Sequence, residues 1–324
     1  MVTIQPPASA AIARNVSATH GSAIAACDGL SLPLERAIVR TVAYADIFDY
    51  PLTAAELQRY LIGVTSSLVE VEQALGAGQL VPEQLTEQDG FFALPSRAAP
   101  AATRGARTAR AEQLWPRARH YGRIIASLPF VRMVAITGEL AMDNVQPDSD
   151  IDYFIVTTPG RLWLCRLFVV AVVRAAAPRG VVLCPNYLLS ERALAFEERN
   201  LYSAHEVAQM VPLTGFTTYQ RLRAANGWVA EFLPNADGPP RSHGAPPRFR
   251  LARHMTERAL GGRLGDWLEG WEMRRKVRKL GRVAGDNREA AYSADWCKGH
   301  VNGHEQRILT TYTERWRAAE GRLP

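Results

Sequence analysis

Two aspartates placed two residues apart are the strongest chemical signal in this sequence. Asp150 and Asp152 stand at the start of an apolar run that ends at Thr157. Side chains at positions i and i+2 of a strand point to the same face, so a strand here would aim both carboxylates at one point. Neighbouring carboxylates repel each other unless a proton or a cation intervenes. Because hard oxygen ligands suit Mg²⁺ or Mn²⁺, the pair predicts a divalent-metal site.

A glycine precedes this pair, at the end of another apolar run. Residues 131–136 have the β-branched composition of a buried strand, and Gly138 follows them as a tight turn or a helix start. A glycine lets the backbone approach a phosphate, and the N–H groups of a following helix face such an anion. Polar turn residues over 143–149 then return the chain to the aspartates. Metal ions held by such carboxylates can stabilise the entering and leaving oxygens of a phosphoryl displacement.

This arrangement resembles the nucleotidyltransferase superfamily of the DNA polymerase β type. The hallmark of that family is a strand, Gly-Ser or Gly-Gly, a spacer, and Asp-x-Asp on the next strand. Gly138, Asp150 and Asp152 match the pattern within residues 131–190. The resemblance implies metal-dependent transfer of a nucleoside monophosphate from a nucleoside triphosphate. It assigns the two aspartates to metal binding and catalysis, and Gly138 to the nucleotide.

The sequence departs from the family pattern at two places. Glu139 stands at the nucleotide-binding turn where the family has Ser or Gly, so it must either bind metal or point away from a triphosphate. The family often has a third carboxylate on a later strand, and the matching segment, 181–189, has none. Asn186 is the candidate for that position, completing the metal pocket or orienting the acceptor hydroxyl. Glu206 would supply a carboxylate if it turned inward, although a glutamate of this kind is more often at the surface.

Other functions remain open on the residues alone. The two departures favour a catalytically degenerate module that binds a nucleotide or a metal without turnover. A nucleic-acid-binding regulator could use an N-terminal winged-helix-like unit and the basic run 274–282. The segment 148–150 could also be a purely structural Asp-Ser-Asp turn. The acceptor, which could be a small molecule, a protein or an RNA, cannot be read because a fold does not specify its substrate.

The N-terminal region predicts three helices and a hairpin, as in a winged helix. Thr53 and Ser67 each open a capping box, with a glutamate three residues later. The hairpin is expected to pair residues 80–81 with 91–94. The recognition helix expected over 66–77 carries acidic residues and no Lys or Arg, so specific DNA binding is not favoured.

A helix expected from about Thr103 connects this region to the core. Arg104, Arg107 and Arg110 recur on one of its faces, either as a solvated surface or as a stripe that faces phosphate. Pro116 is expected to kink or restart the helix.

The predicted fold class is α+β, with a small mixed sheet and helices in a nucleotidyltransferase core. That core is flanked by the winged-helix-like domain and by a helical C-terminal region. The expected parts are a disordered leader (1–30), the winged-helix-like domain (31–95), the connecting helix (96–129), the core (130–233), a linker (234–247) and a helical basic C-terminal region (248–324).

Composition sets broad limits on partners and location. The 324 residues carry a formal net charge of +6, which permits a polyanionic partner without requiring one. The four cysteines are scattered, as is usual for a reducing compartment, so we expect a cytoplasmic protein. The most apolar stretch, 162–177, is short and interrupted by Arg166 and Arg174, so no membrane span is expected.

Overall fold

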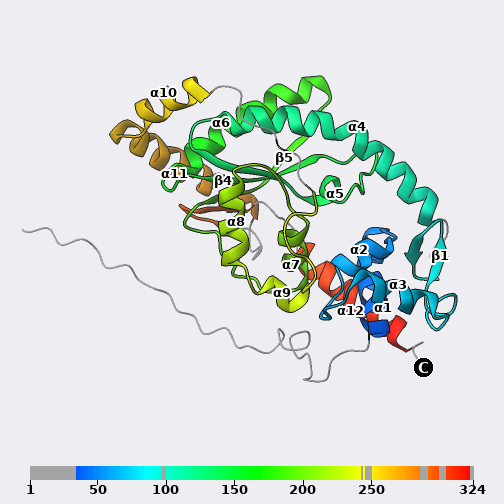
Figure 1. Cartoon of the computed structure of the whole chain (residues 1–324). Helices are drawn as coiled ribbons and strands as arrows, with labels where there is room; N and C mark the ends of the chain where they lie inside the picture. The colour runs from blue at the N-terminus through cyan, green and yellow to red at the C-terminus, as the bar shows by residue number, and fades with distance from the viewer. Residues whose placement is uncertain are drawn as a thin grey trace, which may run out of the picture. The chain divides into compact units, whose positions relative to one another are not determined.

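A six-stranded mixed sheet lies at the centre of the described chain (Figure 1). In the computed structural model, the described residues are 34–95, 100–241, 244, 250–284, 291–298 and 304–321. The predicted leader and part of the predicted linker fall outside them. The strands are β3 (Val131–Ile136), β4 (Ile151–Thr157), β5 (Leu183–Ser190), β6 (Val211–Thr214), β7 (Ala291–Tyr292) and β8 (Trp296–Lys298).

The strand order is β6-β3-β4-β5-β8-β7. Strands β4 and β5 are parallel, and the other neighbouring pairs are antiparallel. The strands expected over residues 131–136, from Asp150 to Thr157 and over 181–189 are therefore all present. The mixed α+β class is confirmed in this general form.

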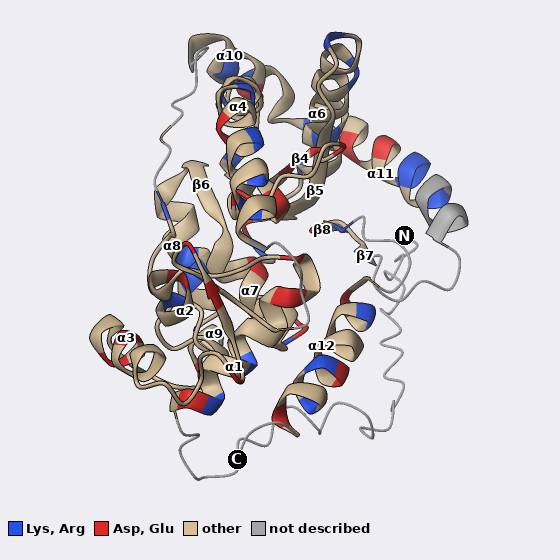
Figure 2. Ribbon diagram, turned by 90° about the vertical axis from the view of Figure 1, so that its right-hand side faces the viewer, with Lys and Arg blue, Asp and Glu red and all other residues tan. Residues whose placement is uncertain are grey.

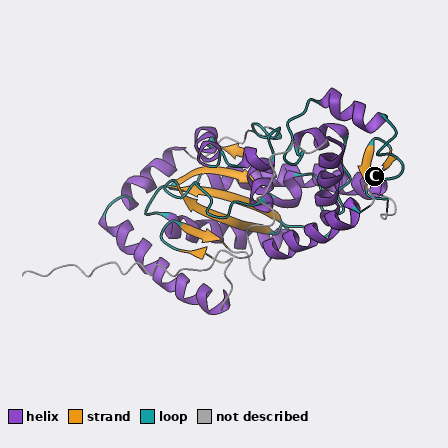
Figure 3. Ribbon diagram, turned by 90° about the horizontal axis from the view of Figure 1, so that it is seen from below, coloured by secondary structure: helices purple, strands orange, loops and turns teal. Residues whose placement is uncertain are grey.

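Helices cover both faces of the sheet (Figure 3), because successive strand residues point to opposite sides. Val134 and Ile155 belong to one buried cluster, whereas Ala135 and Phe154 belong to the other. The first cluster includes residues of α4 (Pro100–Ala126) and α6 (Leu162–Ala176), with α11 (Arg263–Ala284) packed against it. The second includes residues of α7 (Leu201–Gln209) and α12 (His304–Glu320).

The N-terminal region contains the expected helices followed by a hairpin. Thr53 and Ser67 both form complete capping boxes with the glutamates three residues later. The first hairpin arm, however, is residues 86–88 and not 80–81, which lie in a turn. Leu80 packs into the local core, and the true arm is polar, so it has no apolar signal. The elements are α1 (Leu34–Ala45), η1 (Asp46–Phe48), α2 (Ala54–Arg59), α3 (Leu68–Gly76), β1 (Thr86–Gln88) and β2 (Phe91–Ala93).

Helix α4 continues through Pro116 as one helix of 27 residues, so the expected restart does not occur. The side chains on either side of the proline, Trp115 and Ala118, are buried in the sheet-side core. Burial of this middle segment offsets the backbone hydrogen bond that proline removes.

Three short strands escaped prediction. No strand was expected at β6, and β7 and β8 lie in 248–324, which was expected to be helical. β6 contains Pro212 and lies at the sheet edge, where a missing N–H is tolerated. β7 and β8 are only two and three residues long. The remaining elements are α5 (Gly138–Ala141), η2 (Ala177–Arg179), α8 (Phe216–Ala225), α9 (Val229–Phe232) and α10 (Arg250–Leu260).

Residues 32–324 cluster as a single compact unit, so the N-terminal helices and the sheet pack together. Among the described helices, none has the length and apolar content needed to cross a membrane.

Candidate functional site

All five site residues predicted from the sequence line one cavity of about 700 Å³. Residues of the sheet, of α7 and of the N-terminal helices all line this cavity. This convergence of segments far apart in the chain is the central feature of the site. The five residues are Gly138, Glu139, Asp150, Asp152 and Asn186.

The two aspartates lie at the start of β4, and the thiol of Cys184 lies close to both. Asp150 precedes the strand, Asp152 is its second residue, and Cys184 is the register partner of Asp152 on β5. One ligand atom from each of these three side chains lies within 4.8 Å of the others. The sequence pattern did not reveal Cys184 as a site residue, because it does not fix the register between β4 and β5.

A bulge in β5 shapes this part of the cavity. Asp152 pairs with Cys184, but Phe154 pairs with Tyr187, so β5 contains one extra residue here. Both Cys184 and Asn186 line the cavity, while Tyr187 packs beside Phe154 in the core. The bulge therefore lets β5 present two polar side chains to the cavity and still return to the sheet register.

The aspartate pair is poorly stabilised as two bare anions. Burial raises the pKa of Asp152 to about 8, and the negative charges of Asp150 and Glu206 add to the rise. Burial also raises the pKa of Asp150, with a smaller contribution from Glu139. The thiol of Cys184 keeps its proton, since burial and the two aspartates raise its pKa. A cation at this point would relieve the repulsion.

Gly138 begins α5, directly after β3, and has a positive φ of 64°. The neighbouring Thr137 N–H donates a hydrogen bond to the Asp152 carbonyl, 3.2 Å away, which fixes the turn against β4. The glycine turn and the aspartates are thus held together by the β3–β4 pairing.

Glu139 uses its carboxylate to hold the turn that precedes the aspartates. It accepts hydrogen bonds from the Gln146 side-chain amide at 2.6 Å and from the Ser149 hydroxyl. Its oxygens are therefore engaged within the protein, although the residue still borders the cavity. The sequence left open whether Glu139 binds metal or points away from a triphosphate. Its contacts with the 146–149 turn favour a carboxylate engaged in that turn over one that binds metal.

Glu206 turns inward from α7 and lines the same cavity. Its Oε2 atom is inaccessible to solvent and has no hydrogen-bond partner within the described residues. Burial raises the pKa of Glu206 to about 7, with the positive charge of Lys298 opposing the rise. Its surroundings were hidden in the sequence, because the α7 face that meets the sheet depends on tertiary packing.

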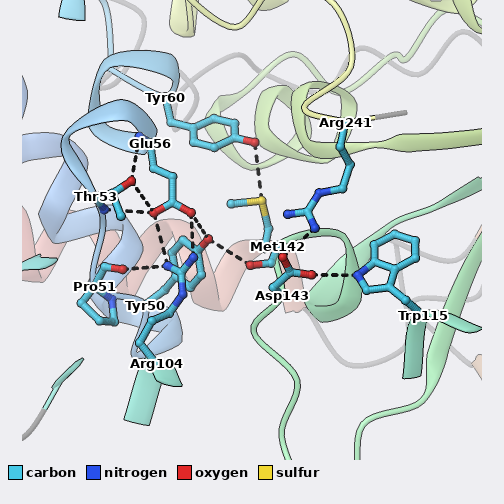
Figure 4. A network of polar contacts seen from close by, with 10 residues as sticks. All are labelled: Tyr50, Pro51, Thr53, Glu56, Tyr60, Arg104, Trp115, Met142, Asp143 and Arg241. Atoms are coloured by element: carbon cyan, nitrogen blue, oxygen red, sulfur yellow. Dashed lines mark hydrogen bonds and ion pairs between the residues drawn. The ribbon is translucent and has the colours of Figure 1, made fainter. Parts of the chain in front are cut away.

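Two of the three arginines in the α4 stripe have a different role from either one expected, whereas Arg110 is exposed, as a solvated face requires. Arg104 and Arg107 are buried, so they form neither a solvated face nor a phosphate-binding stripe. Arg104 donates to the Pro51 carbonyl at 2.8 Å and to the Glu56 carboxylate at 2.7 Å (Figure 4). Arg107 donates to the Phe48 carbonyl at 2.8 Å. Both arginines tie α4 to the N-terminal helices.

A second set of contacts holds the turn that follows α5 (Figure 4). The Tyr50 hydroxyl donates to the Met142 carbonyl at 2.9 Å. Trp115 and Arg241 donate to the two carboxylate oxygens of Asp143, at 2.8 and 2.6 Å. The short helix that carries Gly138 and Glu139 is therefore braced from the N-terminal helices, from α4 and from the segment after α9.

The basic run 274–282 lies on α11, and Lys and Arg residues also occur along α4 and α12 (Figure 2). Arg275 forms an ion pair with the buried Glu272 at 2.6 Å, so part of this charge is used within the helix. The side chains of residues 279–282 lie outside the described set. Among the side chains of this run that the structure describes, residues 274–278, none lines the 700 Å³ cavity.

No protein-family model, curated protein or solved structure matches the chain. Conclusions about function therefore depend on the geometry and chemistry of the cavity.

Proposed function

We propose that the chain is a divalent-metal-dependent nucleotidyltransferase. The observation that carries this proposal is the convergence of the Gly138 turn, Asp150 and Asp152 on one cavity. The strand–turn–strand order around them is the order that the resemblance to DNA polymerase β-type enzymes implies. A cavity of about 700 Å³ is also within the usual range for small-molecule and cofactor sites.

The donor set fits a divalent cation. Asp150 and Asp152 offer hard carboxylate oxygens within 4.8 Å of each other. Burial, with a smaller contribution from neighbouring negative charges, raises the pKa of both, so a cation would stabilise their charged forms. We assign these two residues as ligands of Mg²⁺ or Mn²⁺, with Cys184 beside them. Such an ion supplies positive charge that offsets the negative charge on the phosphate and on the attacking oxygen.

The proposed reaction is a displacement at the α-phosphorus of a nucleoside triphosphate. The acceptor hydroxyl oxygen forms a bond to that phosphorus, and the bond to the oxygen that bridges to the β-phosphate breaks. Pyrophosphate leaves with the electron pair, and the hydroxyl proton passes to solvent. The protein contributes mainly by positioning the reactants. In this proposal the backbone at Gly138 approaches the triphosphate and the Asn186 amide orients the acceptor hydroxyl.

The N-terminal helices and hairpin support a winged-helix-like domain that forms part of the active-site wall. Tyr44 and Tyr50 from this region line the cavity. Helix α3, in the place of a recognition helix, carries Glu70 and Glu72 and neither Lys nor Arg. A wall of the catalytic cavity is therefore a better supported role for this domain than reading a DNA groove.

A module that binds metal or nucleotide without turnover is the second candidate. One observation favours it: the described residues that line the cavity include neither Lys nor Arg. Phosphoryl-transfer enzymes commonly use such cations to neutralise charge at the transition state. The two candidates differ in whether pyrophosphate is released.

The test is pyrophosphate release from labelled nucleoside triphosphates with Mg²⁺ or Mn²⁺, using hydroxyl-bearing acceptors that include amino sugars and RNA. Asp152→Asn and Asp150→Asn should each lower the rate by about 100-fold or more, since both remove a metal ligand. Asp89→Asn, in the exposed β1–β2 turn, is the matched control. Equal rates in wild type and Asp152→Asn would exclude the enzyme. Calorimetric nucleotide binding without pyrophosphate would select the second candidate.

A further inference from the structure

The cavity wall is strongly acidic. Besides Asp150 and Asp152, its lining includes the carboxylates of Glu139, Asp148 and Glu206, and no Lys or Arg among the described residues. A metal-bound triphosphate is largely neutralised by its own ions, so it would leave much of this negative charge uncompensated. The remaining reactant, the acceptor, is the molecule that could balance it.

Aromatic side chains line the same cavity. Tyr44, Phe48 and Tyr60 come from the N-terminal region, and Tyr202 comes from α7. The faces of such rings carry negative electrostatic potential and attract cations. Tyr44 stacks on His205 with ring centroids 3.9 Å apart, so this part of the wall is already ordered by contacts within the protein.

Glu206 supplies the sharpest evidence of a missing partner. Its Oε2 atom accepts no hydrogen bond from the described residues, although nearly all buried polar atoms have a partner. The nearby cation is Lys298, whose Nζ lies 3.7 Å from a carboxylate oxygen of Glu305 and 3.9 Å from one of Glu198. Its charge is therefore shared with these two glutamates and does not pair with Glu206 alone. Protein atoms cover Oε2 itself, but Glu206 as a whole is only partly buried and lines the cavity, so a ligand there can contact this residue. A ligand with a positively charged N–H donor would compensate the negative charge of this carboxylate.

We propose that the acceptor is a small organic cation, with a protonated amine beside an aromatic or apolar body. Its ammonium group donates to Glu206, and its apolar body contacts the aromatic wall. Its reacting hydroxyl faces Asp150 and Asp152. The last contact depends on the proposed nucleotidyltransferase function, whereas recognition of the amine does not.

Tryptamine is a suitable probe because two closely related molecules share its indole body and differ in the charge of the side chain. Indole-3-ethanol replaces the ammonium group with a neutral hydroxyl, and indole-3-acetate replaces the aminomethyl group with a carboxylate. Calorimetry on the full chain, with EDTA and without nucleotide, should show tryptamine binding about tenfold or more tightly than indole-3-ethanol. Indole-3-acetate should not bind, because the wall would repel it.

The Glu206→Gln variant should lose about tenfold or more of the tryptamine affinity, since it removes the charge and keeps the shape. Glu197→Gln, an exposed substitution just before α7, is the matched control and should bind as wild type does. Equal binding of tryptamine and indole-3-ethanol by wild type would overturn the proposal, whether or not the variant folds. Equal tryptamine binding by wild type and a folded Glu206→Gln would also overturn it.

The outcomes separate this inference from the proposed enzyme. Amine-selective binding that depends on Glu206, without any release of pyrophosphate, would uphold the cation site and remove the transferase. Pyrophosphate release that depends on Asp152, without amine selectivity, would uphold the transferase and remove the cation site.

Discussion

The Asp152 carboxylate occupies the space that a side chain on Gly138 would need. A Cβ atom built on Gly138 would come closer than 3.0 Å to Oδ2 of Asp152, a separation that real Cβ atoms essentially never show. The φ of 64° at this glycine adds a second constraint, since side chains rarely tolerate the left-handed region. The glycine is therefore required both by its backbone conformation and by the position of a proposed metal ligand.

Gly138→Ala should displace the Asp152 carboxylate and weaken the metal site. We expect Mn²⁺ affinity, measured by calorimetry, to fall by about tenfold or more, because small errors in ligand placement have large effects. Gly180→Ala is the matched control: Gly180 has a φ of 67°, but nothing lies within 4 Å of its added Cβ. The control should show only backbone strain, about 1–2 kcal/mol, and unchanged Mn²⁺ binding. If both variants bind Mn²⁺ equally, the contact with Asp152 has no role.

Asp152→Asn should stabilise the metal-free chain at neutral and alkaline pH. The folded pKa of about 8 lies well above the usual value for Asp, so the folded state is favoured when the group is protonated. That contribution is complete below the unfolded pKa, near 4, and is lost as the pH rises through about 8. Since each pKa unit corresponds to about 1.4 kcal/mol, even part of this shift predicts a measurable gain for the asparagine variant.

Urea unfolding in EDTA at pH 4.5 and pH 8.5 measures this effect. The free energy of unfolding of Asp152→Asn should exceed that of wild type by a small amount at pH 4.5 and by a larger amount at pH 8.5. Asp89→Asn, in the exposed hairpin turn, should show no such change with pH. A gain that is equal at both pH values would show that the charge on Asp152 is not the source of the instability.

Sequence patterns predicted the parts of this molecule that local rules determine. The capping boxes at Thr53 and Ser67 mark the starts of two helices, and both are present because they involve only neighbouring residues. Asp150 and Asp152 share a face because strand side chains alternate. The glycine turn and the aspartates could be placed together for the same local reason.

The features that escaped prediction depend on contacts between distant segments. Cys184 reaches the aspartates through the β4–β5 register, which the sequence does not give. The sequence left open whether Glu206 turns inward, and the packing of α7 on the sheet decides it. Arg104 looked like part of a surface stripe because its partner, Glu56, lies 48 residues earlier in the chain. Neither register nor long-range pairing can be derived from the periodicity of one segment.

Glu56→Gln should destabilise the chain strongly at neutral pH. Burial by itself would raise the pKa of Glu56, but the hydrogen bonds and charge of Arg104 outweigh that effect and lower it. A lowered carboxylate pKa stabilises the fold above the unfolded pKa, and the contribution disappears as the pH falls through the folded pKa. The Glu56 side chain is 24% exposed, so removing one partner of this partly buried pair should cost about 2 kcal/mol at pH 7, less than for a fully buried pair. The difference in free energy of unfolding between wild type and Glu56→Gln should become smaller as the pH falls below about 4.

Glu70→Gln is the matched control, because Glu70 closes the equivalent capping box at Ser67 and lies at the surface. Among the described residues it has no arginine partner comparable to Arg104, so its substitution should lower the free energy of unfolding much less at every pH. Chemical denaturation from pH 3 to pH 7 gives both profiles. Similar profiles for the two variants would mean that the capping box, and not Arg104, accounts for the role of Glu56.

Cys184 should bias the metal preference of the site. A cysteine sulfur is a softer ligand than a carboxylate oxygen, so its presence beside Asp150 and Asp152 disfavours Mg²⁺ relative to thiophilic divalent ions. Cys184→Asp adds a third hard ligand and should raise Mg²⁺ affinity relative to Mn²⁺ affinity by on the order of tenfold. Cys184→Ser removes the sulfur without adding a carboxylate, so it separates the two effects. Competition between Mg²⁺ and Mn²⁺, followed by the electron paramagnetic resonance signal of free Mn²⁺, gives the ratio without depending on turnover. An unchanged ratio in a folded Cys184→Asp would mean that the β5 side chain does not contact the ion.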